Sequence, residues 1–159
     1  MDDAMKKEQA KKMYNIFCQT LDAIDLKYTE EEEDLRIRLS ARGEDLPMEL
    51  VIRMNVEMQL VQIISRIPCE MPEDKRIDGA IAISAINNKM VNGCFDLDLS
   101  DGVIFFRMSS SFRDFLLSQE SCKYMTYCVF STVDNYNDKL LMLSKGLLKL
   151  EDFLKAEME

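Results

Sequence analysis

The first part of the chain has the apolar spacing of an amphipathic helix. In residues 3–25, apolar side chains recur at steps of three and four residues, and most of the lysines lie outside this stripe. The stripe consists of Ala10, Met13, Phe17, Leu21 and Ile24. The pattern predicts a helix that lays one face on a core. A basic helix on a membrane surface is the alternative, which the short polar face disfavours.

Three runs after this helix have the two-residue period of β-strands. Apolar and polar side chains alternate in residues 35–39 and 48–55, which predicts two strands with one buried face each. Residues 58–67 are apolar on both faces, which predicts a central strand or one covered on both sides. Pro68 and Pro72 are expected to end this third strand.

A second helix is predicted over residues 73–91. Pro72 suits its first turn, and Asn92-Gly93 supplies a stop signal. The middle of the segment, residues 77–86, is apolar nearly all round, so we expect the helix to be covered on more than one side. It would either pack tightly on the sheet of its own subunit or also meet its copy in a dimer.

A β-hairpin is predicted around Asp101-Gly102, a dipeptide typical of two-residue turns. Such a turn would fix the register of the strands on either side of it. The predicted neighbours on the buried face are Leu99 with Ile104, Leu97 with Phe106, and Phe95 with Met108. On the other face, Asp96 would lie opposite Arg107. That face also carries Val103 and Phe105, two apolar residues among charges.

The last third of the chain is predicted to be helical. Ser118 is a suitable N-cap for a long helix, and Gly146 a suitable residue to end it. Residues 147–154 are expected to fold back as a short terminal helix.

The predicted order of elements is helix, three antiparallel strands, helix, two antiparallel strands, helix. Two groups of antiparallel strands separated by a helix predict an α+β fold with the helices mainly on one side of the sheet. No linker or change of composition divides the chain, so we expect one domain over residues 1–159 with its core at about 10–155.

Charge and composition narrow the class of partner. The formal net charge of −9 repels phosphate backbones and anionic membranes, so we expect binding neither to nucleic acid nor to membranes. No apolar run is long enough to span a bilayer, and the N-terminal residues lack the apolar core of a signal peptide. The five cysteines contain no CxxC pair and are expected to be reduced. These features predict a cytoplasmic protein.

The sequence contains no histidine, which removes the commonest general acid–base and metal-ligating side chain. Ser-His-Asp and Cys-His catalysis are therefore excluded. A carboxylate site made by Asp96, Asp98 and Glu120 is conceivable, but alternating aspartates are common on the solvent face of a hairpin. The acidic run from Glu30 to Asp34 lacks the spacing and turn glycine of a calcium site, so we expect a solvated approach to a strand. The sequence predicts no cofactor, no metal site and no enzymatic activity.

Four local strings carry a resemblance to a known family. They are residues 61–68 (VQIISRIP), 85–88 (AINN), 93–98 (GCFDLD) leading to Asp101-Gly102, and 133–136 (VDNY). With the order of elements, they make the chain similar, over about residues 10–155, to the YbjN-like family of bacterial sensory transduction regulators. The fold of that family resembles that of class I type III secretion chaperones. The resemblance implies a non-catalytic, dimeric domain with a regulatory or chaperone-like role, and it supplies no catalytic residues.

These observations predict a homodimeric protein-binding domain. It would hold an extended or amphipathic segment of another protein against an open face or an edge of the sheet. Val51, Val103 and Phe105 are the predicted contact residues, with Asp96 and Arg107 at the rim, because apolar residues interrupt a charged strand face there. The alternatives are a small carboxylate-dependent enzyme with a deep acidic pocket, and a structural subunit of a larger assembly. The sequence leaves the identity of the partner open.

Overall fold

The computed structural model describes all of residues 1–159 and contains one six-stranded antiparallel sheet with helices. The elements are α1 (Asp3–Ala23), β1 (Tyr28–Glu31), β2 (Arg36–Arg42), β3 (Pro47–Asn55), β4 (Leu60–Glu70), α2 (Arg76–Asn87), β5 (Cys94–Leu97), β6 (Val103–Ser111), α3 (Gln119–Ser144) and α4 (Leu150–Met158). Short 3-10 turns precede β2 at Glu32–Asp34 and α2 at Glu73–Lys75. The strand order is β1-β2-β3-β4-β6-β5. The predicted α+β class is confirmed.

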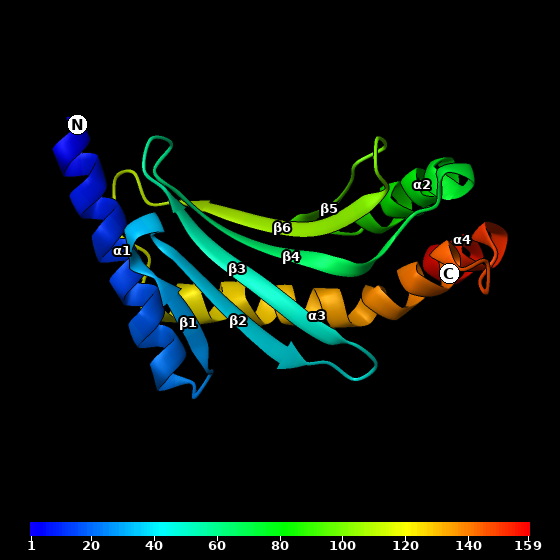
Figure 1. Ribbon diagram of the computed structural model, residues 1–159, viewed down its shortest axis with the longest axis horizontal. Coiled ribbons are helices and arrows are strands. Elements are labelled where there is room, and N and C mark those ends of the chain that lie inside the picture. The colour runs from blue at the N-terminus through cyan, green and yellow to red at the C-terminus, as the bar shows by residue number, and fades with distance from the viewer.

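The helices lie against one face of the sheet and at its ends. In Figure 1 the strands lie in front of α3, which runs along the back of the sheet and packs mainly on β4. Helix α1 crosses one end and packs on α3, while α2 and α4 lie together at the other end. No helix crosses the front of the strands, so one face of the sheet is left uncovered.

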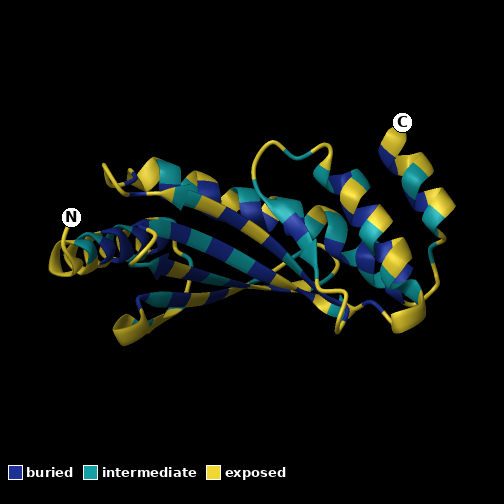
Figure 2. Ribbon diagram, turned by 90° about the horizontal axis from the view of Figure 1, so that it is seen from above, coloured by how far each residue is buried: buried dark blue, intermediate teal, exposed yellow.

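The core forms between the sheet and the helices because the strands alternate as their sequences predict. In β3, Met48, Leu50, Ile52 and Met54 are all buried, and the residues between them are not. Figure 2 shows this alternation as bands along the strands. Helix α1 buries its predicted stripe, apart from the half-buried Ile24. Ser118 caps α3 as predicted, because its hydroxyl accepts a hydrogen bond from the Ser121 amide at 3.1 Å.

The prediction of three strands before α2 is wrong, because there are four. The additional strand, β1, contains the first two residues of the acidic run, Glu30 and Glu31. Both carboxylates have a partner in the fold: Glu31 lies opposite Arg36 and forms ion pairs with Arg36 and Arg38, and Glu30 accepts a hydrogen bond from the Tyr14 hydroxyl at 3.0 Å.

The predicted register of the β5–β6 hairpin is wrong by two residues. Phe95 lies opposite Phe106, and Asp96 lies opposite Phe105 instead of Arg107. The loop is longer than two residues, because the Asp98 amide donates to the Val103 carbonyl and Asp98 accepts from the Gly102 amide. A shift of two residues keeps every side chain on its predicted face. Leu99 moves from the predicted core into the exposed loop.

Two further boundaries differ from the prediction. Pro68 does not end β4 but lies inside it, at the irregularity between Arg66 and Glu70, where a missing amide donor breaks no regular pairing. Helix α2 ends at Asn87, and its outer residue Ile77 is 67% exposed. Helix α2 nevertheless packs on both β5 and α4, so it is covered on more than one side within the chain, as predicted.

Candidate protein-binding face

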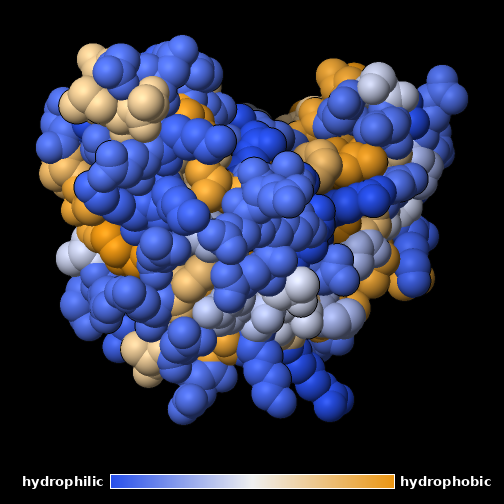
Figure 3. Space-filling view, turned by 60° about the vertical axis from the view of Figure 1, so that its left-hand side comes forward, coloured by the Kyte–Doolittle hydropathy of each residue, from blue (hydrophilic) through white to orange (hydrophobic).

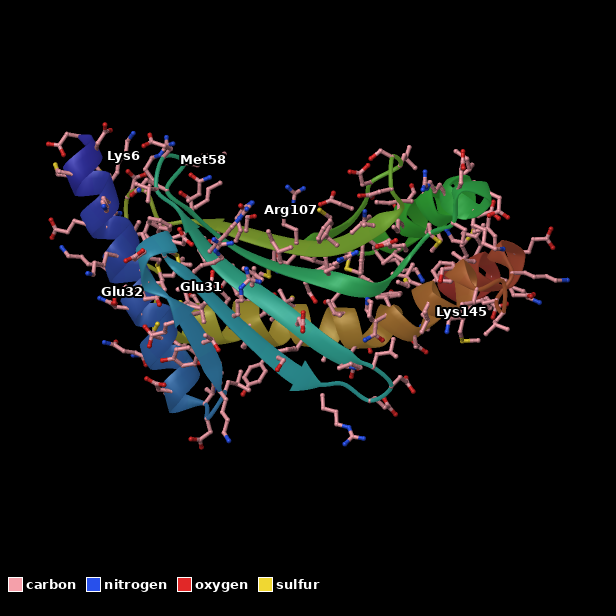
Figure 4. All side chains as sticks on the ribbon, viewed as in Figure 1. Lys6, Glu31, Glu32, Met58, Arg107 and Lys145 are labelled. Carbon is pink, nitrogen blue, oxygen red and sulfur yellow. The ribbon has the colours of Figure 1, made fainter.

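The uncovered side of the sheet is the candidate functional site, and we call it the open sheet face. Its side chains belong to the strand positions that point away from the helices. Among them are Arg36, Arg38, Arg42, Glu49, Val51, Arg53, Gln62, Ile64, Arg66, Asp96, Val103, Phe105 and Arg107. Figure 4 shows Arg107 extending from β6 away from α3. Figure 3, with the α1 side turned forward, shows a mostly hydrophilic surface on which hydrophobic residues form separate patches.

Apolar side chains occupy the middle of the open sheet face. Val51 and Ile64 lie directly opposite each other on β3 and β4. Phe105 lies on β6, directly opposite Arg66 of β4. All three are half-buried by neighbouring side chains, although no helix covers them. Phe105 is the diagonal neighbour of Ile64, because Ile64 lies opposite Arg107, so the three side chains are close enough to contact one partner.

Arginines surround this apolar centre. Six of the eight arginines in the chain, and none of its lysines, belong to the open sheet face. Four of them have a carboxylate partner: Arg36 and Arg38 pair with Glu31, Arg66 with Glu70, and Arg107 with Asp96. Arg42, at the end of β2, and Arg53 have none, and Arg53 instead donates from Nε to Oε1 of Gln62 at 3.0 Å.

The predicted contact residues lie together, with one exception. Val51 and Phe105 belong to the apolar centre, and Asp96 and Arg107 form an ion pair of 2.9 Å at its margin. Both partners of this pair are nearly half exposed, so it contributes little to stability and remains accessible. Val103 lies on the same side of β6 but is only 8% exposed, so it offers little surface to a partner.

Ile64 and Arg53 are among the residues of this face that sequence reasoning missed. The signal for Ile64 was present, because residues 58–67 are apolar on both faces and Ile64 lies on the outer one. Arg53 gave no signal, because its lack of a carboxylate partner depends on which residues β2 and β4 place beside it.

The chemistry outside the apolar centre consists of a depression near β1 and the cysteine thiols. The depression beside the end of β1 contains one carboxylate, that of Glu49, with Lys27 and Arg38 around it. No three histidine, cysteine or acidic side chains are grouped to hold a metal ion. Burial raises the pKa of the Cys18 thiol to about 11 and that of Cys122 to about 12, so both thiols are protonated and weakly nucleophilic at neutral pH.

The raised pKa of Cys122 predicts a loss of stability at alkaline pH. The thiol ionises near pH 9 in the unfolded chain but only near pH 12 in the folded one. Its contribution is therefore fully present below pH 9 and is lost as the pH rises toward 12, by about 1.4 kcal/mol at pH 10. Urea titrations at pH 8 and pH 10 should show a smaller loss for Cys122→Ala than for the wild type. Equal losses would contradict the assigned burial.

None of the helices combines the length and the apolar character needed to cross a lipid bilayer.

Comparisons with known proteins agree on the fold and the family. A search of curated proteins finds no match. The crystal structure of YbjN from E. coli, titled "a putative transcription regulator", superposes with a TM-score of 0.58 at 11% sequence identity, covering 84% of this chain and 92% of that one. At this identity the likeness concerns the fold alone. The family model of YbjN, described as "Putative bacterial sensory transduction regulator", matches residues 15–142. This match spans most of the sequence, and the chain belongs to the YbjN family.

Proposed function

We propose that the protein is a non-catalytic regulatory domain that binds a segment of another protein on its open sheet face. The observation that carries this proposal is the apolar centre formed by Val51, Ile64 and Phe105 on a face that no helix covers. Covering it would remove apolar area from water at about 25 cal/mol per Å². The description of the family as regulators supports the same class of function.

The composition of this face suits protein recognition. Aromatic residues and arginines are enriched at protein interfaces, and buried aromatic anchors surrounded by polar groups carry most of the binding energy. Here Phe105 would be the anchor, and the Asp96–Arg107 pair would lie at the rim. Such pairs on a rim affect association rate and specificity more than affinity.

A segment could also add to an edge of the sheet. Strand β1 pairs only with residues 36–39 of β2, so residues 40–42 have no neighbour on that side. Backbone pairing at such an edge is a common mode of peptide binding. We favour the face over the edge, because the half-buried apolar side chains lie on the face.

The proposal is tested by affinity capture from an extract of the organism that makes the protein. Phe105→Asp should abolish capture of a partner held by the wild type, because it places a charge in the apolar centre. Phe115→Asp is the matched control, since Phe115 is 65% exposed in the loop before α3 and lies outside the open sheet face. Phe115→Asp should still capture the partner that the wild type holds. Retention of the same partner by folded Phe105→Asp would refute the proposal.

We also propose that the domain is a homodimer that associates through α2. Ile77 and Ile81 are one helical turn apart and 67% and 44% exposed, so they form an apolar stripe on the outside of the helix. Light scattering after size exclusion should give twice the chain mass of 18.5 kDa. Ile81→Asp should reduce this to the monomer mass. A monomeric wild type, or a dimer that is insensitive to Ile81→Asp, would count against α2 as the interface.

A further inference from the structure

Strand β3 presents three different side chains in a row on the open sheet face. Glu49, Val51 and Arg53 are separated by two residues each, so they point the same way, about 6.6 Å apart. The row therefore reads acidic, apolar, basic along the strand.

Both charges at the ends of this row lack an ionic partner. The Glu49 side chain forms no ion pair and no hydrogen bond, although its backbone carbonyl accepts from the Ser65 hydroxyl at 2.8 Å. Arg53 has no carboxylate within ion-pair distance, whereas Arg36, Arg38, Arg66 and Arg107 do. Each end of the row therefore carries a charge without an ionic partner in the chain.

The hydrogen bonds of Arg53 orient its guanidinium group for an external partner. Its Nε donates to Oε1 of Gln62 at 3.0 Å, and Nε2 of Gln62 donates to the Ser109 hydroxyl at 3.3 Å. Nη1 and Nη2 have no acceptor in the protein. A planar guanidinium held through Nε can receive a carboxylate on these two nitrogens.

The neighbouring strand β2 places a second positive charge beside Arg53. Arg36 lies directly opposite Arg53 on β2, which places two like charges side by side. The charge of Arg36 is balanced by Glu31 at 3.0 Å and Asp34 at 2.9 Å. The charge of Arg53 is not balanced within the chain, so a carboxylate from a partner would relieve the repulsion.

Building on the proposed function, we infer that the open sheet face takes an extended protein segment whose alternate side chains are acidic, apolar and basic. The acidic side chain pairs with Arg53, the apolar one packs on Val51 and Ile64, and the basic one pairs with Glu49. An extended segment spaces alternate side chains as β3 does, so the three contacts form together. A segment with the order acidic, apolar, basic would run antiparallel to β3, and a segment with the reverse order would run parallel to it.

The inference is tested with three short synthetic peptides and nuclear magnetic resonance titration of the full chain. The peptides carry Asp-x-Leu-x-Lys, Asp-x-Leu-x-Asp or Lys-x-Leu-x-Lys between neutral polar ends. The wild type should bind the mixed peptide about three- to tenfold more tightly than either of the others, as expected for exposed ion pairs. Arg53→Glu should shift the preference to the Lys/Lys peptide, and Glu49→Arg to the Asp/Asp peptide.

The control variant is Arg113→Glu, which changes the same charge outside the open sheet face and should leave the order of affinities unchanged. Equal affinity of all three peptides, or an order that the two β3 variants do not change, overturns the inference. If all three peptides bind equally and Val51→Asp abolishes this binding, the charge pattern is wrong but the proposed function, binding on the open sheet face, is retained. Absence of binding by any of the peptides also overturns the inference, and the capture experiment then decides the proposed function separately.

Discussion

Phe106→Ala is expected to lower the free energy of unfolding by about 3–5 kcal/mol, the usual cost of removing a buried phenylalanine ring. Phe106 is fully buried in the core, where its ring centroid lies 4.9 Å from that of Phe95. The truncation removes apolar contact and leaves a cavity beside a well-packed ring. Urea denaturation followed by circular dichroism measures the loss.

The adjacent residue is the natural control for this experiment. Phe105 has the same side chain on the same strand but points to the open sheet face, where it is half-buried. Phe105→Ala should therefore cost about 1 kcal/mol or less, because no helix closes over the ring. Equal losses for the two variants would mean that another layer covers the open sheet face, and would refute its assignment as a free surface.

Gly102→Ala is expected to destabilise the protein by about 2–5 kcal/mol. Gly102 has a φ of +83°, and a Cβ added there would lie 2.1 Å from the backbone oxygen of Met71. The left-handed conformation alone costs a non-glycine residue about 1–2 kcal/mol. The overlap adds more, because the contacted atom is backbone and Met71 also donates its amide to the Gly102 carbonyl at 2.8 Å. Thermal and urea unfolding would both record the loss.

Gly146→Ala separates the cost of the left-handed backbone conformation from the cost of steric overlap. Gly146 also has a positive φ, +71°, at the end of α3, but a Cβ there would meet only the flexible end of Lys75 at 3.3 Å. We expect it to cost about 1 kcal/mol, from conformation alone. If Gly102→Ala lowered the free energy of unfolding no more than Gly146→Ala does, the hairpin loop would not approach Met71 as closely as described.

The sequence predicts which side of each strand faces the core far better than it predicts how the strands align. Alternation in residues 48–55 assigns both faces of β3 correctly, because each position depends only on its own hydrophobicity. The register of β5–β6 depends instead on the loop. Asp101-Gly102 favours a two-residue turn, but the hydrogen bonds of Asp98 close a longer one. Strand β1 was missed because its carboxylates are stabilised by residues of other elements: Glu31 by arginines of β2 and Glu30 by Tyr14 of α1.

In the binding face too, the sequence predicts single apolar residues but not the interactions between residues that the fold brings together. Val51 and Phe105 were predicted because each is an apolar residue on the outer, charged face of its strand: Val51 lies between Glu49 and Arg53 there, and Phe105 is next to Arg107. The free charges of Glu49 and Arg53 were not, because an ion pair or its absence depends on residues brought together by the fold. The Asp96–Arg107 pair forms even though the predicted register is wrong, since the long side chain of Arg107 reaches Asp96 diagonally.

Site-specific photo-crosslinking tests the binding face most directly. A photoreactive phenylalanine analogue would replace Phe105 in one chain and Ser131, which is exposed on α3, in another. After irradiation in extract of the native organism, we predict a discrete protein adduct at position 105 that disappears when Val51→Asp is added, and no such adduct at position 131. An adduct of the same partner at position 131 but not at position 105, or one at 105 that Val51→Asp leaves unchanged, would contradict the account.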